Sequence, residues 1–209
     1  MGLSQVMSLN KAKVKTIEEI RRIKTNIELS AINKGIKVIM IASTNPSEGR
    51  STIASNLAIK IAQGGKKTVL IDCDLRSSNI HNLFNLPNET GLSNYVMDEI
   101  SFEDIINPAD QENLYVVTSG TKKSYPYQVI DCPKFKNVFM QLKDNYECII
   151  IDTPPLIKAA DAQVISQYVD GCIFVVAAGQ IDRGSAVSGK EFLEKVNANI
   201  LGVVLNKTE

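Results

Sequence analysis

The chain has 209 residues, of which 44% are hydrophobic, so it is long enough to bury one substantial core. Lys plus Arg and Asp plus Glu number 23 each, and this balance gives no global charge that would draw the chain to nucleic acid or to an anionic bilayer. No run reaches the roughly 18 apolar residues of a membrane span. We therefore expect no nucleic-acid partner and no direct membrane insertion.

The cysteines predict a reducing compartment. They are widely separated, form no Cys-x-x-Cys pair and have no histidine nearby at metal-ligand spacing, which is typical of free thiols in a cytosolic protein. The four positions are Cys73, Cys132, Cys148 and Cys172.

The chain begins with a segment of helical character. Residues 16–32 place apolar side chains at close to helical spacing with charges between them, which predicts an amphipathic helix that ends near Gly35. We assign residues 1–36 to an N-terminal arm that carries this helix, and residues 37–209 to the body of the same domain.

After this arm the pattern changes to an alternation of strands and helices. Six short runs rich in Val and Ile are apolar throughout, as strands covered on both faces should be; they are residues 38–42, 68–71, 114–117, 148–151, 171–177 and 200–205. Helix-like stretches lie between them at residues 51–63, 102–106, 134–145, 160–168 and 185–196. This alternation predicts an α/β fold, a three-layer sandwich whose twisted, mostly parallel sheet carries helices on both faces.

Polar residues follow three of these predicted strands. The first strand leads into a loop over 43–51, the second ends in Asp72-Cys73-Asp74, and the strand at 148–151 ends in Asp152. In a parallel sheet, ligands bind beyond the carboxyl ends of the strands. We therefore expect these three segments to converge on one ligand site.

The loop over 43–51 resembles a phosphate-binding loop, in which Gly is followed after four residues by Gly-Lys and then Ser or Thr. Here the end of the pattern is Gly49-Arg50-Ser51. Such a loop aims backbone N–H groups and the positive end of a helix dipole at an anion, and its hydroxyl binds magnesium. The alternative is an ordinary strand-to-helix turn capped by Ser51.

The aspartates have two interpretations as well. Asp152 follows an apolar strand, where P-loop enzymes hold magnesium, but an aspartate there also caps turns. Asp72 and Asp74 lie one residue apart, an arrangement that gains little unless a cation or an arginine compensates the two charges. Arg76 is the candidate for that arginine.

Three stretches together carry a resemblance to a known family. The loop Ser-x-x-Pro-x-Glu-Gly-x-Ser-Thr, the strand VLIDCDLR and the strand CIIIDTPP resemble the bacterial tyrosine kinases of capsular and exopolysaccharide biosynthesis of the CpsD/CapB type, which are P-loop proteins related to the MinD and ParA ATPases. The similarity extends to EEIRRIKTNIELS, GLSNYV and LGVVLNK, and so covers nearly the whole chain.

The resemblance implies an ATP-dependent, autophosphorylating protein tyrosine kinase that regulates capsular or exopolysaccharide biosynthesis and binds ATP or ADP with Mg²⁺. Residues that would bind the nucleotide are Ser47, Glu48, Gly49, Arg50, Ser51, Thr52 and Asn206. Residues that would carry catalysis are Asp72, which would take the proton of the attacking tyrosine, Asp74 and Arg50. Residues that would hold the metal are Ser51, Asp72 and Asp152.

The resemblance also implies partners. In the family, the positions of Glu18, Arg21 and Lys24 form an inter-subunit motif, so we expect a homo-oligomer built partly by the N-terminal helix. A transmembrane adaptor would hold the kinase at the inner face of the cell membrane, as a peripheral cytoplasmic protein. The alternative for the helix is a simple amphipathic cover for the sheet, which explains its apolar face equally well.

The sequence departs from the family at several positions. Arg50 replaces the loop lysine, Ser47 replaces a glycine that would tolerate positive φ, and Ser78 stands in place of proline. The residues after Asn206 contain no tyrosine cluster. These departures suggest an alternative function, a catalytically weakened nucleotide-binding subunit for regulation or assembly, in which nucleotide binding is weaker but retained.

Other P-loop classes fit less well. The septum-site and plasmid-partition ATPases carry a second lysine five residues before the loop lysine, where this chain has Asn45. An iron-sulfur reductase is disfavoured because the cysteines do not fall at ligand positions.

Overall fold

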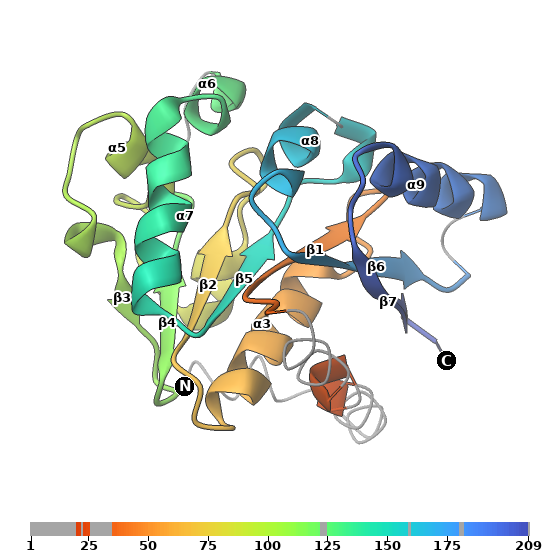
Figure 1. Cartoon of the computed structure of the whole chain (residues 1–209), viewed down its shortest axis with the longest axis horizontal. Coiled ribbons are helices and arrows are strands. Elements are labelled where there is room, and N and C mark those ends of the chain that lie inside the picture. Colours follow the sequence, from red (N-terminus) through yellow and green to blue (C-terminus); the bar gives the residue numbers. More distant parts are fainter. Residues whose placement is uncertain are drawn as a thin grey trace.

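The computed structural model describes residues 20–21, 23–25, 35–121, 125–158, 160–179 and 182–208. Its centre is a single seven-stranded sheet (Figure 1). In chain order the strands are β1 (Val38–Ser43), β2 (Thr68–Asp72), β3 (Asn107–Pro108), β4 (Leu114–Val117), β5 (Cys148–Asp152), β6 (Gly171–Ala177) and β7 (Ile200–Asn206). They lie in the spatial order β3-β4-β2-β5-β1-β6-β7, and every pair is parallel except β3 with β4.

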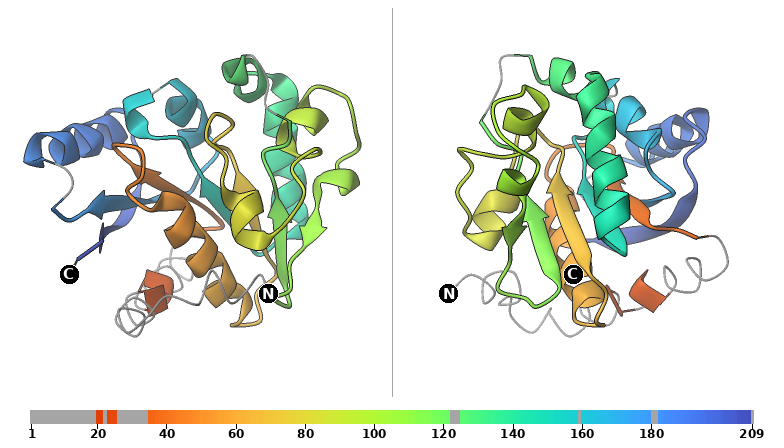
Figure 2. Two further views of the ribbon diagram at one scale, coloured as in Figure 1. Left: turned by 180° about the vertical axis from the view of Figure 1, so that it is seen from behind. Right: turned by 60° about the vertical axis from the view of Figure 1, so that its left-hand side comes forward.

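Helices cover both faces of this sheet. The α-helices are α3 (Arg50–Ala62), α4 (Ile80–Phe84), α5 (Leu92–Val96), α6 (Pro126–Ile130), α7 (Pro133–Asn145), α8 (Ala160–Ser166) and α9 (Arg183–Lys195), with short 3-10 helices η1 (Glu103–Ile105) and η2 (Leu156–Lys158). One buried cluster packs α3 and α4 against the sheet, and the other packs α7, α8 and α9 against the opposite face. The views in Figure 2 show the resulting three layers.

The apolar character of the strands follows from this double coverage. In β1, Val38 and Met40 belong to the cluster under α7, whereas Ile39 and Ile41 belong to the cluster under α3. Successive side chains of a strand point to opposite faces, so a strand buried on both faces needs apolar residues at every position. The sequence of β1 meets that need.

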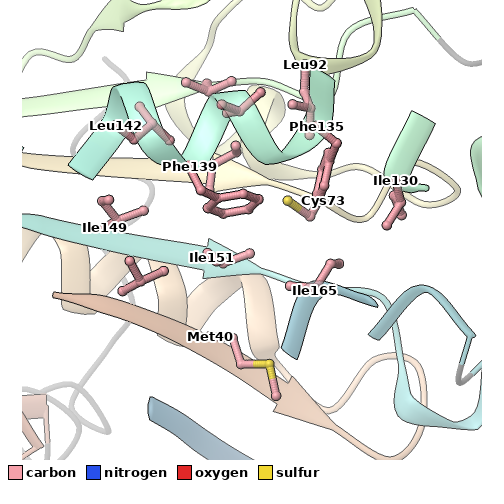
Figure 3. Close-up of a cluster of buried hydrophobic side chains, with 14 of the residues drawn as sticks. Met40, Cys73, Leu92, Ile130, Phe135, Phe139, Leu142, Ile149, Ile151 and Ile165 are labelled. Atoms are coloured by element: carbon pink, nitrogen blue, oxygen red, sulfur yellow. The ribbon is translucent and has the colours of Figure 1, made fainter. Parts of the chain in front are cut away.

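Helix α7 packs on the sheet through aromatic side chains. Figure 3 shows Phe135 and Phe139 facing Ile149 and Ile151 of β5. Phe139 also stacks on Tyr168, with ring centroids 5.0 Å apart. Large apolar contacts of this kind, with favourable ring geometry, hold the helix in place.

The predicted α/β fold is confirmed, and all six predicted strands are present with ends within one residue of the expected positions. Strand β3 and the short helices α4, α5 and α6 were not predicted, because two to five residues are too few to establish a hydrophobic period. Residues 102–106 contain the 3-10 helix η1 instead of an α-helix. Of the helix expected over 16–32, residues 20–21 and 23–25 are helical and the remainder lies outside the described residues.

Strand order brings the three expected segments to one edge. Strand β5 lies between β1 and β2, and all three run parallel, so their carboxyl ends point the same way. The register pairs Asp72 with Asp152, and Ile41 with Asp152. The loop after β1 therefore begins next to both carboxylates.

Among the described residues, no helix has the length and apolar character needed to cross a membrane.

Truncating an aromatic side chain under α7 should destabilise the fold strongly. Phe139 is buried, so Phe139→Ala is expected to lower the free energy of unfolding by about 3–5 kcal/mol through lost burial and the cavity left behind. Urea denaturation would measure this loss. The control is Met140→Ala on the same helix, where the side chain is 56% exposed and the change should stay within about 0.5 kcal/mol. Equal losses in the two variants would contradict the assigned packing.

Candidate functional site

The loop between β1 and α3 is shaped to receive an anion. Helix α3 begins at Arg50, its N-cap is Gly49 with a φ of 99°, and no side chain caps its first turn. The first backbone N–H groups of a helix have no partner within the helix, and they lie at the positive end of its dipole. In α3 these donors remain available to a phosphate.

The side chains of Glu48 and Asn206 hold this loop in shape through hydrogen bonds to backbone groups. Glu48 is buried, and its carboxylate accepts hydrogen bonds from the backbone N–H of Asn45 at 2.6 Å and of Ala177 at 3.1 Å. Asn206 donates from Nδ2 to the carbonyl oxygen of Glu48 at 2.8 Å. Glu48 and Asn206, both expected to touch the nucleotide, thus tie the loop to β6 and β7.

The glycine at the end of the loop is required by space as well as by conformation. A Cβ atom on Gly49 would lie 2.1 Å from Nδ2 of Asn206, far closer than atoms approach, and the φ of Gly49 is in the left-handed region. Ser47 is exposed and has a φ of 63°, so the residue that replaces a family glycine does occupy the strained conformation.

Arg50 turns inward instead of outward. Its Nε donates to the carbonyl oxygen of Thr153 at 2.8 Å, and its Nη1 donates to Oγ of Ser43 at 2.6 Å and to the carbonyl oxygen of Asn45 at 3.0 Å. Nη2 lies 3.4 Å from Oδ2 of Asp74, and both side chains are buried. The guanidinium therefore joins the ends of β1 and β5 to the segment after β2.

The prediction that Arg76 compensates the carboxylates of Asp72 and Asp74 is wrong. Arg76 binds Asp161 of α8, with Nε 2.9 Å from Oδ2. Asp74 is compensated by Arg50 instead. Helix α8 brings Asp161 beside Arg76, an arrangement that sequence spacing does not reveal.

Ser51, in the first turn of α3, and Asp152, at the end of β5, are in direct contact. The Ser51 hydroxyl donates to Oδ2 of Asp152 at 2.5 Å, while Oδ1 of Asp152 is buried and has no hydrogen-bond partner among the described residues. Burial raises the pKa of Asp152 to about 7, against the hydrogen bond from Ser51 and the charge of Arg50, which lower it. A buried oxygen without a partner is expensive unless a ligand completes it.

Asp72 holds the segment that follows β2. Its Oδ1 accepts from the backbone N–H of Asp74 at 3.0 Å, and its Oδ2 accepts from the N–H groups of Asn79 at 3.3 Å and Ile80 at 3.2 Å. Burial, and then the charge of Asp152, raise the pKa of Asp72 well above its usual range. A carboxylate oxygen has two acceptor sites, so these contacts leave room for a proton.

The residues present fit a magnesium ion. Within the described ranges, no three His, Cys, Asp or Glu side chains converge on one point. Magnesium does not need such a cage, since it is usually held by one or two protein oxygens together with phosphates and water. The hydroxyl of Ser51 and the unpartnered Oδ1 of Asp152 are oxygen ligands of this kind.

The other expected site residues are placed as follows. Thr52 lies in the first turn of α3, where its carbonyl accepts from Nδ2 of Asn56 at 2.8 Å. Glu18 lies outside the described residues, Arg21 is exposed and Lys24 is partly buried, with its Nζ close to Gly64 at the end of α3. A role of these three positions between subunits stays a prediction.

Sequence reasoning missed three acceptors in the site, Ser43, Thr153 and the carbonyl of Asn45. Ser43 and Asn45 lie in the predicted loop, and Thr153 directly follows Asp152. Their part depends on where the Arg50 guanidinium lies, and only the register of β1 against β5 determines that position.

Comparison with known proteins places this geometry in a family. The ParA family model, described as an NUBPL iron-transfer P-loop NTPase, matches residues 35–209. Tyrosine-protein kinase YwqD of Bacillus subtilis (strain 168) is 34% identical over 201 residues, covering 96% of this chain and 85% of that protein. The crystal structure of the chimerical protein CapA2B2 superposes with a TM-score of 0.88 at 38% identity, covering 91% of this chain and 84% of that one. The chain belongs to the bacterial tyrosine kinases, a family of P-loop NTPases.

The fold of these bacterial tyrosine kinases is shared more widely. The septum site-determining protein MinD of Pyrococcus horikoshii, solved as a complex with Mg-ADP, has a TM-score of 0.70 at 23% identity over 83% of this chain and 72% of that one. At this identity the likeness extends to the fold alone. The expected relation between the bacterial tyrosine kinases and the MinD and ParA ATPases is thereby confirmed for the architecture.

Relieving the left-handed conformation of Ser47 should stabilise the protein. Glycine adopts this φ without steric cost, so Ser47→Gly is expected to raise the free energy of unfolding by about 0.5–1 kcal/mol after its larger unfolded-state entropy is counted. Thermal denaturation measures this gain. The control is Ser77→Gly in an exposed loop without positive φ, where no gain is expected. A loss of stability in Ser47→Gly would contradict the assigned strain.

The buried aspartate at the site predicts a pH dependence of stability in nucleotide-free protein with chelator present. Because the folded pKa of Asp152 is raised to about 7, its neutral form contributes stability that is complete below the unfolded pKa, near 4, and is lost as pH rises to about 7. The side chain of Asp152→Asn cannot ionise. The free energy of unfolding of this variant minus that of wild type should therefore rise by roughly 2–4 kcal/mol between pH 5 and pH 8.

Urea denaturation at several pH values measures that difference. Asp144→Asn, which changes an exposed carboxylate of α7, serves as the control and should follow the wild-type curve. A constant difference between Asp152→Asn and wild type across this range would contradict the assignment.

Proposed function

We propose that the chain is an ATP-dependent protein tyrosine kinase that autophosphorylates and regulates capsular or exopolysaccharide biosynthesis. Support comes from its family and from one observation in the site, the pairing of the Ser51 hydroxyl with the partly unpartnered carboxylate of Asp152 at the start of α3. That arrangement offers a phosphate and a divalent cation adjacent positions, as phosphoryl transfer requires.

Each part of the site would then have a role. The backbone N–H groups of residues 47–52 would receive the α- and β-phosphates, and Asn206 would lie beside the bound nucleotide. Ser51 and Asp152 would hold Mg²⁺, with Asp72 close behind, and the ion when bound would neutralise negative charge on the phosphates.

The transfer step would use the carboxylates after β2. The tyrosine oxygen would attack the γ-phosphorus, the bond from that phosphorus to the β–γ bridging oxygen would break, and ADP would leave. Asp72 would take the phenolic proton, and burial raises the pKa of this carboxyl, which makes it a stronger base than an exposed aspartate. Asp74 would keep the segment in place through Arg50 and the N–H of Ser77.

The cellular setting is part of the same proposal. A transmembrane adaptor would hold the kinase at the inner face of the membrane, and the N-terminal helix with Glu18, Arg21 and Lys24 would contribute to a homo-oligomer. The replacement of the loop lysine by Arg50 favours a second candidate, a nucleotide-binding assembly subunit with weak catalysis, since Arg50 is already bound to protein groups.

A phosphotransfer assay separates the two candidates. The protein would be incubated with Mg-ATP and a tyrosine-bearing peptide, and phosphotyrosine would be measured by mass spectrometry. We expect transfer in wild type and a loss of at least about a hundredfold in Asp72→Ala, because the proton acceptor is removed. Asp144→Ala, remote from this edge of the sheet, should keep wild-type activity.

Two results would change the conclusion. Transfer that appears only in Arg50→Lys would favour the weak assembly subunit. Absence of Mg-ADP binding at millimolar concentration by calorimetry would remove the basis of both candidates.

A further inference from the structure

We propose that Arg50 is a positioning residue that clamps the carboxyl ends of β1, β2 and β5, and that it does not act as the ligand of the nucleotide's terminal phosphate. The inference rests on nucleotide binding at the site of the proposed function. It changes the assignment of the basic loop residue, which in P-loops reaches the β- and γ-phosphates.

The count of donors carries the argument. A guanidinium has five N–H donors, one on Nε and two on each Nη. In this structure Nε donates to Thr153, Nη1 donates to both Ser43 and Asn45, and Nη2 faces Asp74. Four donors are thus engaged by the protein itself, and a single N–H on Nη2 remains.

The acceptors come from three different segments. Ser43 and Asn45 belong to the end of β1 and its loop, Thr153 follows β5, and Asp74 follows β2. A lysine carries its three donors on one nitrogen atom, so it could not reach acceptors spread over three strand ends. The planar fork of arginine suits this bridging task.

Burial makes the clamp costly to release. Arg50 is 7% exposed, and Asp74 and the backbone of Thr153 are buried around it. Turning the guanidinium toward a phosphate would take the Arg50 contacts away from the buried carbonyl of Thr153 and from Oδ2 of Asp74.

The consequence concerns the γ-phosphate. If the clamp stays closed, the loop backbone and Ser51 bind the diphosphate part, and the third phosphate gains little from Arg50. The protein should therefore bind Mg-ADP and a triphosphate analogue with similar affinity. This is a property of Arg50 in this chain, because a lysine in its place would be free to reach the γ-phosphate.

Calorimetry with Mg-ADP and with the non-hydrolysable analogue Mg-AMP-PNP tests the proposal. We expect the two dissociation constants of wild type to agree within about threefold, and Arg50→Met to change both by the same factor. We expect Arg50→Lys to shift the preference toward AMP-PNP by roughly tenfold, since the released ammonium gains a charge-assisted contact with the terminal phosphate. This ratio reports on contact with the terminal phosphate, because a change in folding stability alone would affect the binding of both nucleotides equally.

Two results would overturn the proposal. In one, Arg50→Met weakens AMP-PNP binding at least about tenfold more than ADP binding, as the loss of a direct γ-phosphate ligand would. In the other, Arg50→Lys leaves the ratio of the two affinities unchanged.

A nucleotide-free measurement tests the clamp by itself. Arg50→Met and Ser43→Ala should each lower the Tm by about 3–8 °C, and the double variant should fall by clearly less than the sum, because both changes remove the same contact. The matched control is Ser55→Ala, which changes a buried serine of α3 whose hydroxyl has no partner in the part of the chain that the structure describes. Its effect should add independently to that of Arg50→Met.

The two experiments separate failure of the clamp from failure of the proposed function. Additive effects of Ser43→Ala and Arg50→Met would refute the clamp even if the protein is an active kinase. Absence of phosphotransfer, with coupled Tm effects and equal nucleotide affinities, would leave the clamp intact and refute the kinase.

Discussion

The site depends on one electrostatic constraint, the burial of three aspartates at neighbouring strand ends where one guanidinium pairs with Asp74. Asp72, Asp74 and Asp152 lie at the carboxyl ends of neighbouring strands, and all three are shielded from water. Carboxylates buried at adjacent strand ends cannot all remain ionised unless other groups compensate their charges. Arg50 pairs with one of them, backbone N–H groups satisfy another, and Asp152 keeps one oxygen without a partner. A cation at this position would complete the arrangement.

The same constraint links the shape of the loop to the sheet. Arg50 stands at the first residue of α3, so the loop that would receive phosphates and the segment that carries Asp74 are joined through one side chain. Glu48 and Asn206 hold the other side of the loop against β6 and β7. A loop fixed at both sides has its backbone donors oriented before any ligand arrives, which lowers the ordering cost of binding.

Replacement of lysine by arginine in such a loop can add structural contacts as well as remove a phosphate ligand. Lysine offers one mobile charge, whereas arginine offers a rigid fork that can bridge several acceptors. In this member of the bacterial tyrosine kinases the guanidinium joins three strand ends. On our proposal, the loop backbone and Ser51 would bind the phosphates. The family architecture can thus be kept while the contribution of its basic residue changes.

The sequence by itself determined the parallel sheet and the ends of its six longer strands, because strands buried on both faces are apolar at every position. It also placed Ser51, Asp72 and Asp152 at one edge of the sheet, because the carboxyl ends of parallel strands lie at the same edge. The sequence did not determine which side chains of the site form hydrogen bonds and ion pairs with one another. The choice of Arg50 over Arg76 as the partner of Asp74, the inward turn of Glu48 and the part played by Ser43 and Thr153 were decided by tertiary structure. Such pairings depend on strand register and on distances between segments far apart in the chain, which local spacing does not encode.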